Sequence, residues 1–340
     1  MNAARTARAL VKRALCALLY YTGLLALVAR FCAPRGPIIL CAHRVVAHDD
    51  PFFPGIPRER FAAEIAHLAR HYRVLPLAEV VEAVTHGRPL PRRTVAITLD
   101  DGFADNFSEA WPVLKAHNVP ATIFLVSDCV ETGRLPWPDR LAHLLRDTTR
   151  MSLALRRPVS RVFPLTTRDE RLEALAVLLP LLKECPTETR RAVMEDIEAA
   201  LEVPPDRGQM LTWEQCRAMT GAGVTFGAHT VTHPILSRTD ALEVKREIAE
   251  SKAAIEAHLG VPVRYFAYPN DDWTPDVAEA VDAAGLEAAL AGHRELDGAG
   301  VNRLAIGRRP WALGSVSVFA AELGVSDWLE WLEPFVGFLL

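Results

Sequence analysis

The sequence lacks paired cysteines, an excess of basic residues and any uncharged apolar run of full membrane-spanning length. Its six cysteines are scattered and form no C-x-x-C pair, which argues against a zinc knuckle and a disulfide framework. We expect them to be small buried side chains in a reduced compartment. The formal net charge is −4 and Lys and Arg form no basic cluster, so no nucleic-acid partner is expected. Internal repeats and low-complexity tracts are also missing.

The remaining composition is that of a globular protein with a sizeable core. The chain has 340 residues, of which 50% are hydrophobic and 24% are charged, enough for one large domain or two ordinary ones. The composition leaves the oligomeric state open.

The N-terminus carries the chain's apolar segment. Residues 14–29 hold no charge and are flanked by arginine and lysine, but this run is shorter than the ~20 residues that span a bilayer. We predict that residues 1–35 form an N-terminal hydrophobic helix that associates with a bacterial-type cell membrane, on a side that the sequence does not identify. The alternatives are a buried helix of a soluble, cytoplasmic protein and a cleaved signal peptide.

Downstream of residue 36, short apolar runs alternate with amphipathic stretches. Strands are expected at 37–45, 94–99, 121–127, 224–229, 263–269, 287–292 and 302–307, with helices between them, for example at 58–71, 77–87, 106–118 and 241–260. Repeated strand–helix units predict an α/β fold with a mostly parallel sheet or barrel, whose functional residues follow the C-terminal ends of strands.

Two regions depart from this alternation. Residues 130–212 look mostly helical, with loops at Pro158, Pro164 and Pro204–Pro205, and are expected to form a helical insertion between two strands. Residues 313–340 are expected to form an amphipathic helical tail. The predicted organisation is therefore an N-terminal segment (1–35), one catalytic-type domain (36–312) that contains the insertion, and the tail.

A pair of acids ends one buried strand. The run "TVAITL" is followed by Asp100, Asp101 and Gly102, and adjacent carboxylates repel each other. An Asp-Gly turn accounts for one acid but gives no reason for the other. The turn can bring both side chains to the same end of the strand.

A histidine pair follows another strand. His229 and His233, in "HTVTHP", are four residues apart, but Pro234 and the intervening threonines and valine disfavour a helix. On an extended or turning segment the two rings still share a side. Two satisfied surface histidines are the alternative. Combined with one of the acids, the imidazoles form a site with open positions for a divalent cation, zinc by default, with iron, cobalt or nickel also suited. The second acid would then face a water molecule as its base.

Two further features lie at expected strand ends. "YFAYPN" presents Tyr268, Pro269 and Asn270 in a loop that is suited to contact a sugar, although a packed proline turn explains it equally well. His43 follows the first core strand and joins the same mouth if the strands are neighbours.

These residues resemble the polysaccharide deacetylases of the NodB-homology type, carbohydrate esterase family 4. The family's T-F-D-D motif is matched by "TLDD" and its H-[ST]-x-x-H-P motif by "HTVTHP", in the same order, within a resemblance over about residues 36–312. The resemblance implies a distorted (β/α) barrel, Asp100 as general base, and Asp101, His229 and His233 as metal ligands.

The chain departs from the family at two places. "FAYPN" stands where many members carry an arginine that orients the catalytic Asp, and Ala267 takes that position. The late Leu-x-His that supplies a general acid has no counterpart. His43, in "CAHRV", resembles the early histidine of the subgroup that acts on poly-N-acetylglucosamine, and we predict that it fills this catalytic role.

The predicted function is metal-dependent removal of N-acetyl groups from amino sugars of a polysaccharide or lipid-linked glycan. An alternative is a catalytically inactive, membrane-tethered glycan-binding module of the same fold, which the missing arginine and histidine favour and the complete Asp-Asp-His-His set opposes. A non-haem Fe(II) oxygenase uses the same donor set but typically has a double-stranded β-helix, against the strand–helix alternation seen here.

Overall fold

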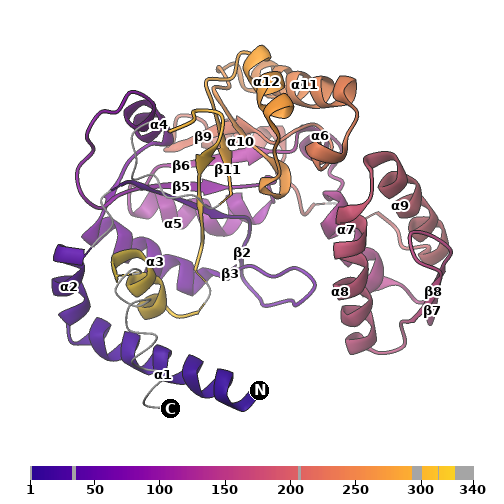
Figure 1. The fold of residues 1–340 in the computed structure, drawn as a ribbon, viewed down its shortest axis with the longest axis horizontal. Coiled ribbons are helices and arrows are strands. Elements are labelled where there is room, and N and C mark those ends of the chain that lie inside the picture. Colours follow the sequence, from indigo (N-terminus) through magenta and orange to yellow (C-terminus); the bar gives the residue numbers. More distant parts are fainter. Residues whose placement is uncertain (1, 33–35, 206–207, 293–300, 313, 326–340) are drawn as a thin grey trace.

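A nearly closed parallel barrel forms the centre of the protein (Figure 1). The computed structural model describes residues 2–32, 36–205, 208–292, 301–312 and 314–325. All strand pairs of the main sheet are parallel among these residues, which confirms the predicted α/β class. In pairing order the strands are β12 (Ile306–Gly307), β11 (Ala288–Ala291), β10 (Tyr265–Ala267), β9 (Val224–Ala228), β6 (Ala121–Leu125), β5 (Thr94–Leu99), β1 (Ile38–Ala42) and β13 (Arg309–Pro310), with β4 (Arg73–Val74) also beside β5.

One short segment, residues 306–310, brings the two edges of the sheet together. Its first part, β12, pairs with β11, and its last part, β13, pairs with β1. Arg308 lies between the two parts, at the point where the chain changes partner. The strand that completes the barrel therefore also delivers a side chain to its mouth.

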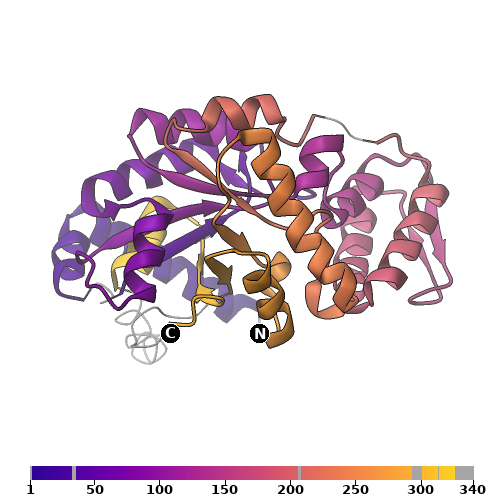
Figure 2. The ribbon, with the colours of Figure 1, turned by 90° about the horizontal axis from the view of Figure 1, so that it is seen from above.

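Helices lie outside the strands (Figure 2). The predicted helix at 58–71 is α3 (Arg58–His71), and the one at 106–118 is a π-helical turn η1 (Asn106–Ala110) that continues into α5 (Trp111–Ala116). Pro112 lies in the first turn of α5, next to the point where the chain passes from π-helix to α-helix. The others around the barrel are α4 (Leu77–Thr85), α10 (Trp213–Met219), α11 (Ala241–Leu259) and α12 (Pro275–Ala283); β2 (Val45–Val46) and β3 (Ile56–Pro57) form a separate two-stranded sheet.

The insertion forms a lobe beside the barrel mouth, to the right in Figure 1. After α6 (Ser127–Thr132) it contains α7 (Trp137–Asp147), α8 (Arg168–Glu184) and α9 (Thr187–Leu201), which pack around a core of their own. The expectation of loops at Pro158 and Pro164 was wrong in part: β7 (Ser152–Leu155) and β8 (Arg161–Pro164) form an antiparallel hairpin. Side chains of β7 alternate between exposed and buried, and Pro164 is accommodated at the end of β8.

Two helices replace the single predicted N-terminal one. α1 (Asn2–Tyr21) and α2 (Leu24–Cys32) are separated at Gly23, whose φ of 76° favours glycine. Cys16, Leu19, Leu25 and Ala29 pack against a helix at residues 316–325, the described part of the predicted tail. Among the described residues, no helix has both the length and the apolar character needed to cross a bilayer. Residues 326–340 of the predicted tail lie outside the described residues.

Candidate functional site

Five strands deliver side chains to the same mouth of the barrel. His43, Asp100, His229, Tyr268 and Arg308 each follow directly after the last residue of β1, β5, β9, β10 and β12. All five line one cavity of about 180 Å³, together with Asp101, Asn270, Asp271 and Cys41 from the barrel and with Pro138, Asp139 and Lys183 from the insertion. The candidate residues therefore lie at the C-terminal ends of the strands, as predicted.

The Asp-Asp-Gly turn explains how one strand end presents two acids. The Asp100 N–H donates to the Ala42 carbonyl at 2.9 Å, which keeps Asp100 aligned with β1. The chain then turns through left-handed backbone at Asp101 (φ 72°) and Gly102 (φ 79°). Glycine is favoured at position 102 by this backbone, and a Cβ there would also lie 2.6 Å from Leu125 Cδ2. Asp101 turns away from Asp100 toward the histidines, and each acid has its own partners.

Asp100 is held by an arginine that the sequence analysis missed. Arg308 Nη1 and Nη2 donate to Asp100 Oδ1 and Oδ2 at 2.7 and 2.8 Å, and both side chains are almost fully buried. Burial would raise the pKa of Asp100, but the Arg308 guanidinium, with His229, outweighs it and lowers that pKa below its usual value. Ala267 stands where many family members carry the arginine that orients the catalytic Asp, and in this chain Arg308, between β12 and β13, holds Asp100 instead.

Asp101, His229 and His233 form a cluster with the geometry of a cation site. Asp101 Oδ1 lies 3.4 Å from His229 Nε2 and 3.3 Å from His233 Nε2, yet this buried oxygen accepts no well-aligned hydrogen bond. Ligand atoms of a tetrahedral site with bonds of ~2.0–2.1 Å are about 3.3 Å apart, so the spacing fits a divalent ion. The ligand atoms of the three residues all lie within 4.8 Å of one another.

Hydrogen bonding sets the tautomer of one ligand. His229 Nδ1 lies 2.7 Å from the Ala267 carbonyl oxygen, which can only accept, so the neutral ring carries its proton on Nδ1 and its lone pair on Nε2. Burial lowers the pKa of His233 to about 4, so its ring is neutral at physiological pH. Burial opposes ionisation of Asp101, but His233 and His229 hold its pKa far below the usual range. Burial opposes protonation of His229, but Asp101 and Asp100 raise its pKa above the usual value, so its Nε2 gives up a proton when a cation binds. The cluster thus offers one carboxylate and two imidazoles.

The histidine loop is supported by two residues that the sequence analysis did not single out. The buried carboxylate of Glu247, on α11, accepts from the Val231 and Thr232 N–H groups, both at 2.8 Å. Thr230 Oγ1 accepts from the His233 N–H at 3.0 Å, and Thr230 and His233 both have left-handed backbone (φ 69° and 60°). Non-glycine residues in this region cost energy, and such strain is concentrated at functional sites. No local sequence motif includes Glu247, although it shares the buried face of the predicted helix with Val244 and Ile248.

The predicted sugar-contacting loop is placed at the cavity only in part. Tyr268 and Asn270 line the cavity, whereas Pro269 is buried and is not among the residues that line it. The Tyr268 hydroxyl donates to the Leu304 carbonyl at 2.8 Å, so its ring forms the wall with its polar end already bonded. Asn270, exposed and left-handed (φ 56°), has the freest polar group of the three.

Two protonatable side chains complete the cavity. His43 is exposed and lies near both acids, as the sequence analysis expected. Asp139, in the first turn of α7, was not predicted because it belongs to the insertion. Burial, with the nearby Asp101 charge, raises the pKa of Asp139 to about 7. The insertion therefore contributes an acid that gains or loses a proton near neutrality.

Comparison with known proteins agrees with this geometry. The polysaccharide deacetylase family matches residues 87–289, more than half of the chain. The chain belongs to the polysaccharide deacetylase family. Within the family, it is 33% identical over 76 residues to YxkH of Bacillus subtilis (strain 168), and 34% identical over 61 residues to the poly-β-1,6-N-acetyl-D-glucosamine N-deacetylase of Escherichia coli (strain K12). These matches span 22% and 18% of this chain but only 27% and 9% of those proteins.

Solved structures share the fold. IcaB from Ammonifex degensii superimposes with a TM-score of 0.57 at 20% identity, over 85% of this chain and 97% of that one. The deacetylase PplD of Streptococcus pyogenes gives a TM-score of 0.55 at 16% identity, over 82% and 92% of the two chains. At these identities the likeness establishes the deacetylase barrel and not the substrate.

Proposed function

We propose that this protein is a metal-dependent N-deacetylase that hydrolyses the acetamido groups of amino sugars in a polysaccharide or a lipid-linked glycan. The observation that carries the proposal is the division of labour at Asp100–Asp101. One acid is locked by Arg308 and the other completes a cluster with two Nε2 atoms. The alternative of a catalytically inactive glycan-binding module loses support. It rested partly on the absence of an arginine beside the catalytic Asp, and Arg308 takes that role.

In the proposed reaction, Asp101, His229 and His233 hold the cation, zinc by default. A bound divalent ion supplies Lewis acidity, which polarises the acetamide carbonyl and acidifies water. Asp100 is ionised at neutral pH because its pKa is lowered, and it accepts the proton of the attacking water. Arg308 fixes both carboxylate oxygens, so the group is oriented before substrate binds.

The leaving nitrogen needs a proton for the C–N bond to break and release acetate and a free amine. We propose His43 as its donor. Asp139 is a second candidate, because its carboxyl lines the same cavity and its pKa of about 7 lets it carry a proton at neutral pH. The two lie on different parts of the molecule, β1 and the insertion, so replacing each one separately distinguishes them.

The substrate class is proposed from the chemistry of the family. The Escherichia coli relative is named for poly-β-1,6-N-acetyl-D-glucosamine, and Asn270 offers an amide for sugar hydroxyls at the cavity. Acetate release from β-1,6-linked N-acetylglucosamine oligomers, with metal content measured on the same sample, tests the proposal. Release that is abolished by a chelator and restored by zinc is expected; no release from any N-acetylated glycan at full metal occupancy would contradict it.

We also propose that α1 and α2 rest on a membrane surface. Leu18, Tyr21, Leu24 and Leu27 are 62%, 78%, 46% and 55% exposed, while the opposite side of the helices packs on residues 316–325. An apolar strip flanked by basic residues suits an interfacial helix.

Replacing Leu18 and Leu27 together by Gln should release the full-length protein from anionic vesicles without changing its melting temperature. Leu242→Gln is the control, because Leu242 is even more exposed (78%) than Leu18 and Leu27 but lies on α11. Vesicle binding that survives the double substitution would refute the proposed surface.

A further inference from the structure

A second cavity, of about 270 Å³, adjoins the metal-site cavity and lies between the insertion and the barrel. Trp137 lines it, whereas the next two residues, Pro138 and Asp139, line the metal-site cavity. Thr232 and Pro234 also line it, whereas His233 between them lines the metal-site cavity. The two cavities therefore share both the start of α7 and the histidine loop.

Arg190 gives this cavity a buried positive charge whose hydrogen bonds go to neutral groups. It is only 3% exposed and lines the cavity from the first turns of α9. Its guanidinium donates to the Cys185 carbonyl at 3.3 Å and to Thr187 Oγ1 at 2.9 Å, which are neutral acceptors. Within the described part of the chain, no carboxylate forms an ion pair with it. Burial lowers the pKa of Arg190 to about 10, a sign that its charge is poorly solvated.

The indole of Trp137 adds a donor. Its ring packs under the Arg190 guanidinium, 5.0 Å from Cζ to the ring centroid, and the residue is 6% exposed. Its Nε1–H is buried and has no acceptor among the described residues. The indole nitrogen and the guanidinium can only donate hydrogen bonds. A suitable partner for both therefore carries several hydrogen-bond acceptors.

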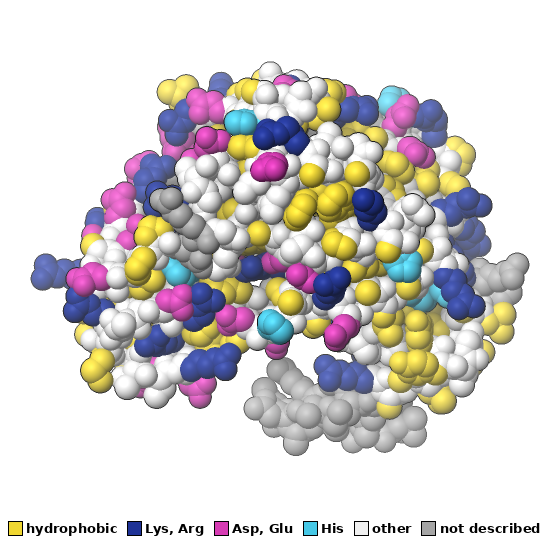
Figure 3. Space-filling model, turned by 180° about the vertical axis from the view of Figure 1, so that it is seen from behind, with side chains coloured by type: hydrophobic (Ala, Val, Ile, Leu, Met, Phe, Trp, Pro, Cys, Tyr) yellow, Lys and Arg dark blue, Asp and Glu magenta, His cyan; other side chains and the backbone are white. Residues whose placement is uncertain are grey.

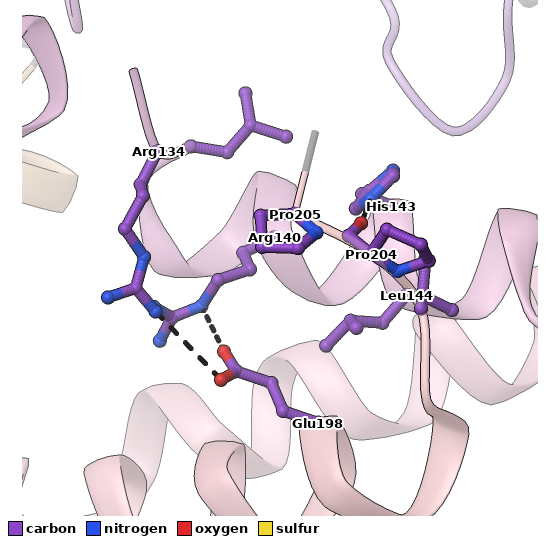
Figure 4. A pocket seen from close by; sticks show the side chains of 9 residues that line it. Arg134, Arg140, His143, Leu144, Glu198, Pro204 and Pro205 are labelled. Atoms are coloured by element: carbon purple, nitrogen blue, oxygen red, sulfur yellow. Dashed lines mark hydrogen bonds and ion pairs between the residues drawn. The ribbon is translucent and has the colours of Figure 1, made fainter. Parts of the chain in front are cut away.

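The acids of the cavity do not meet this need. Arg140 Nε lies 2.7 Å from Glu198 Oε1 and Arg134 Nη2 lies 3.9 Å from Oε2, so both arginines converge on that carboxylate (Figure 4). Asp128 and Glu195 also line the cavity, but neither forms an ion pair with Arg190. Basic and acidic side chains are interspersed over the surface drawn in Figure 3. Arg190, in contrast, is buried and forms no direct ion pair with a described carboxylate.

We propose that the cavity around Arg190 and Trp137 binds an anionic group, a phosphate or a carboxylate, that is carried by the glycan whose acetamido group enters the metal site. The inference rests on the proposed deacetylase function and narrows its substrate class to an acidic or phosphate-linked amino-sugar glycan. A guanidinium with an adjacent N–H donor is a favourable binding arrangement for such oxyanions.

Binding is measured with three probes on full-length Asp100→Asn protein, which should not consume them. The probes are a neutral N-acetylglucosamine tetramer, the same tetramer with a reducing-end phosphate, and the same tetramer with a terminal uronic acid. At least one anionic probe should bind about tenfold more tightly than the neutral one, and the better of the two identifies the group. Equal affinities for all three would overturn the inference. These titrations do not depend on turnover, so they remain informative even if the proposed function fails.

Single substitutions in the cavity show which side chains cause the preference for the anionic probe. Arg190→Gln and Trp137→Phe should each reduce the preference for the anionic probe several-fold and leave the affinity for the neutral tetramer unchanged. Arg191→Gln is the matched control, since Arg191 lines the same cavity but is already paired with Glu188 and Glu243. Equal losses in Arg190→Gln and Arg191→Gln, or a loss of neutral-probe binding alone, would overturn the assignment. If Arg190→Gln does not fold, Trp137→Phe and Arg190→Lys test the assignment in its place. Trp137→Phe should lose the preference for the anionic probe, and Arg190→Lys should keep most of it.

Discussion

The buried pair of Asp100 and Arg308 gives the most direct test of the proposed site. Arg308→Gln removes the positive charge and at least one of two hydrogen bonds, of 2.7 and 2.8 Å, and leaves a carboxylate buried without its counter-ion. Removing one partner of a buried pair typically costs about 3–5 kcal/mol. Since domains are stable by about 5–15 kcal/mol, the variant should fold but melt at a clearly lower temperature.

The pH dependence of this loss has a defined sign. In the wild type the pKa of Asp100 is lowered, so its ionisation contributes stability above the unfolded-state pKa of about 3.9, and the contribution is lost as pH falls through the folded-state pKa. In Arg308→Gln the guanidinium no longer offsets the effect of burial, so the pKa of Asp100 is higher than in the wild type. The difference in unfolding free energy between wild type and variant should therefore be largest near neutral pH and shrink on acidification.

The assay is thermal or denaturant unfolding of chelator-treated protein at several pH values, combined with a double-mutant cycle. Arg308→Gln and Asp100→Asn together should be less destabilising than the sum of the two, with a coupling of at least about 1 kcal/mol. Arg309→Gln is the control, because Arg309 donates to the Glu322 carbonyl and not to the site. Additive effects, or a loss that does not change with pH, would refute the reasoning.

The other site residues lead to paired predictions. Asp101→Asn should lose metal and activity together, whereas Asp100→Asn should keep near-normal metal and lose turnover by roughly 100-fold or more; the reverse pattern would exchange their roles. His43→Gln should keep metal but flatten the basic limb of the pH–rate profile, while Asp139→Asn should leave that limb in place; the opposite result assigns the proton to Asp139. His233→Ala should empty the metal site, and full occupancy by elemental analysis would disprove the ligand set.

Local sequence patterns predicted the strands and the residues next to them. The buried run 94–99 and the left-handed Asp101–Gly102 turn depend on neighbouring residues, so "TVAITLDDG" was sufficient to place both acids at a strand end. The same holds for the histidine pair after β9, whose threonines and proline excluded a helix. Parallel pairing alone was enough to predict that the C-terminal ends of these strands meet in one cavity.

Residues that act over long sequence distances were not predictable in this way. Arg308 contacts Asp100, which lies 208 residues earlier in the sequence. Its position depends on segment 306–310, which pairs first with β11 and then with β1 and so closes the barrel. Asp139 reaches the cavity only because the insertion packs beside the barrel mouth. The hairpin of β7 and β8 was missed because four alternating residues are too few to outweigh prolines nearby.

Thr230 shows how the site's backbone strain is connected to its function. A β-branched residue with φ of 69° is strained, yet its Oγ1 accepts the His233 N–H, which is buried. Thr230→Val keeps the shape and the strain but leaves that N–H without an acceptor, which should cost about 1–3 kcal/mol and weaken metal binding through His233.

Thr230→Ser is the matched variant, because it keeps the acceptor and reduces the strain. It should remain within about 1 kcal/mol of wild type and bind metal normally, since the lost methyl group and the relieved strain act in opposite directions. The family motif H-[ST]-x-x-H, which accepts either hydroxyl residue at this position, agrees with that expectation. Unfolding and metal titration of both variants test it: a Thr230→Val protein with wild-type stability and affinity would show that the hydroxyl does not hold the loop, and that the left-handed backbone at His233 is set by the fold without it.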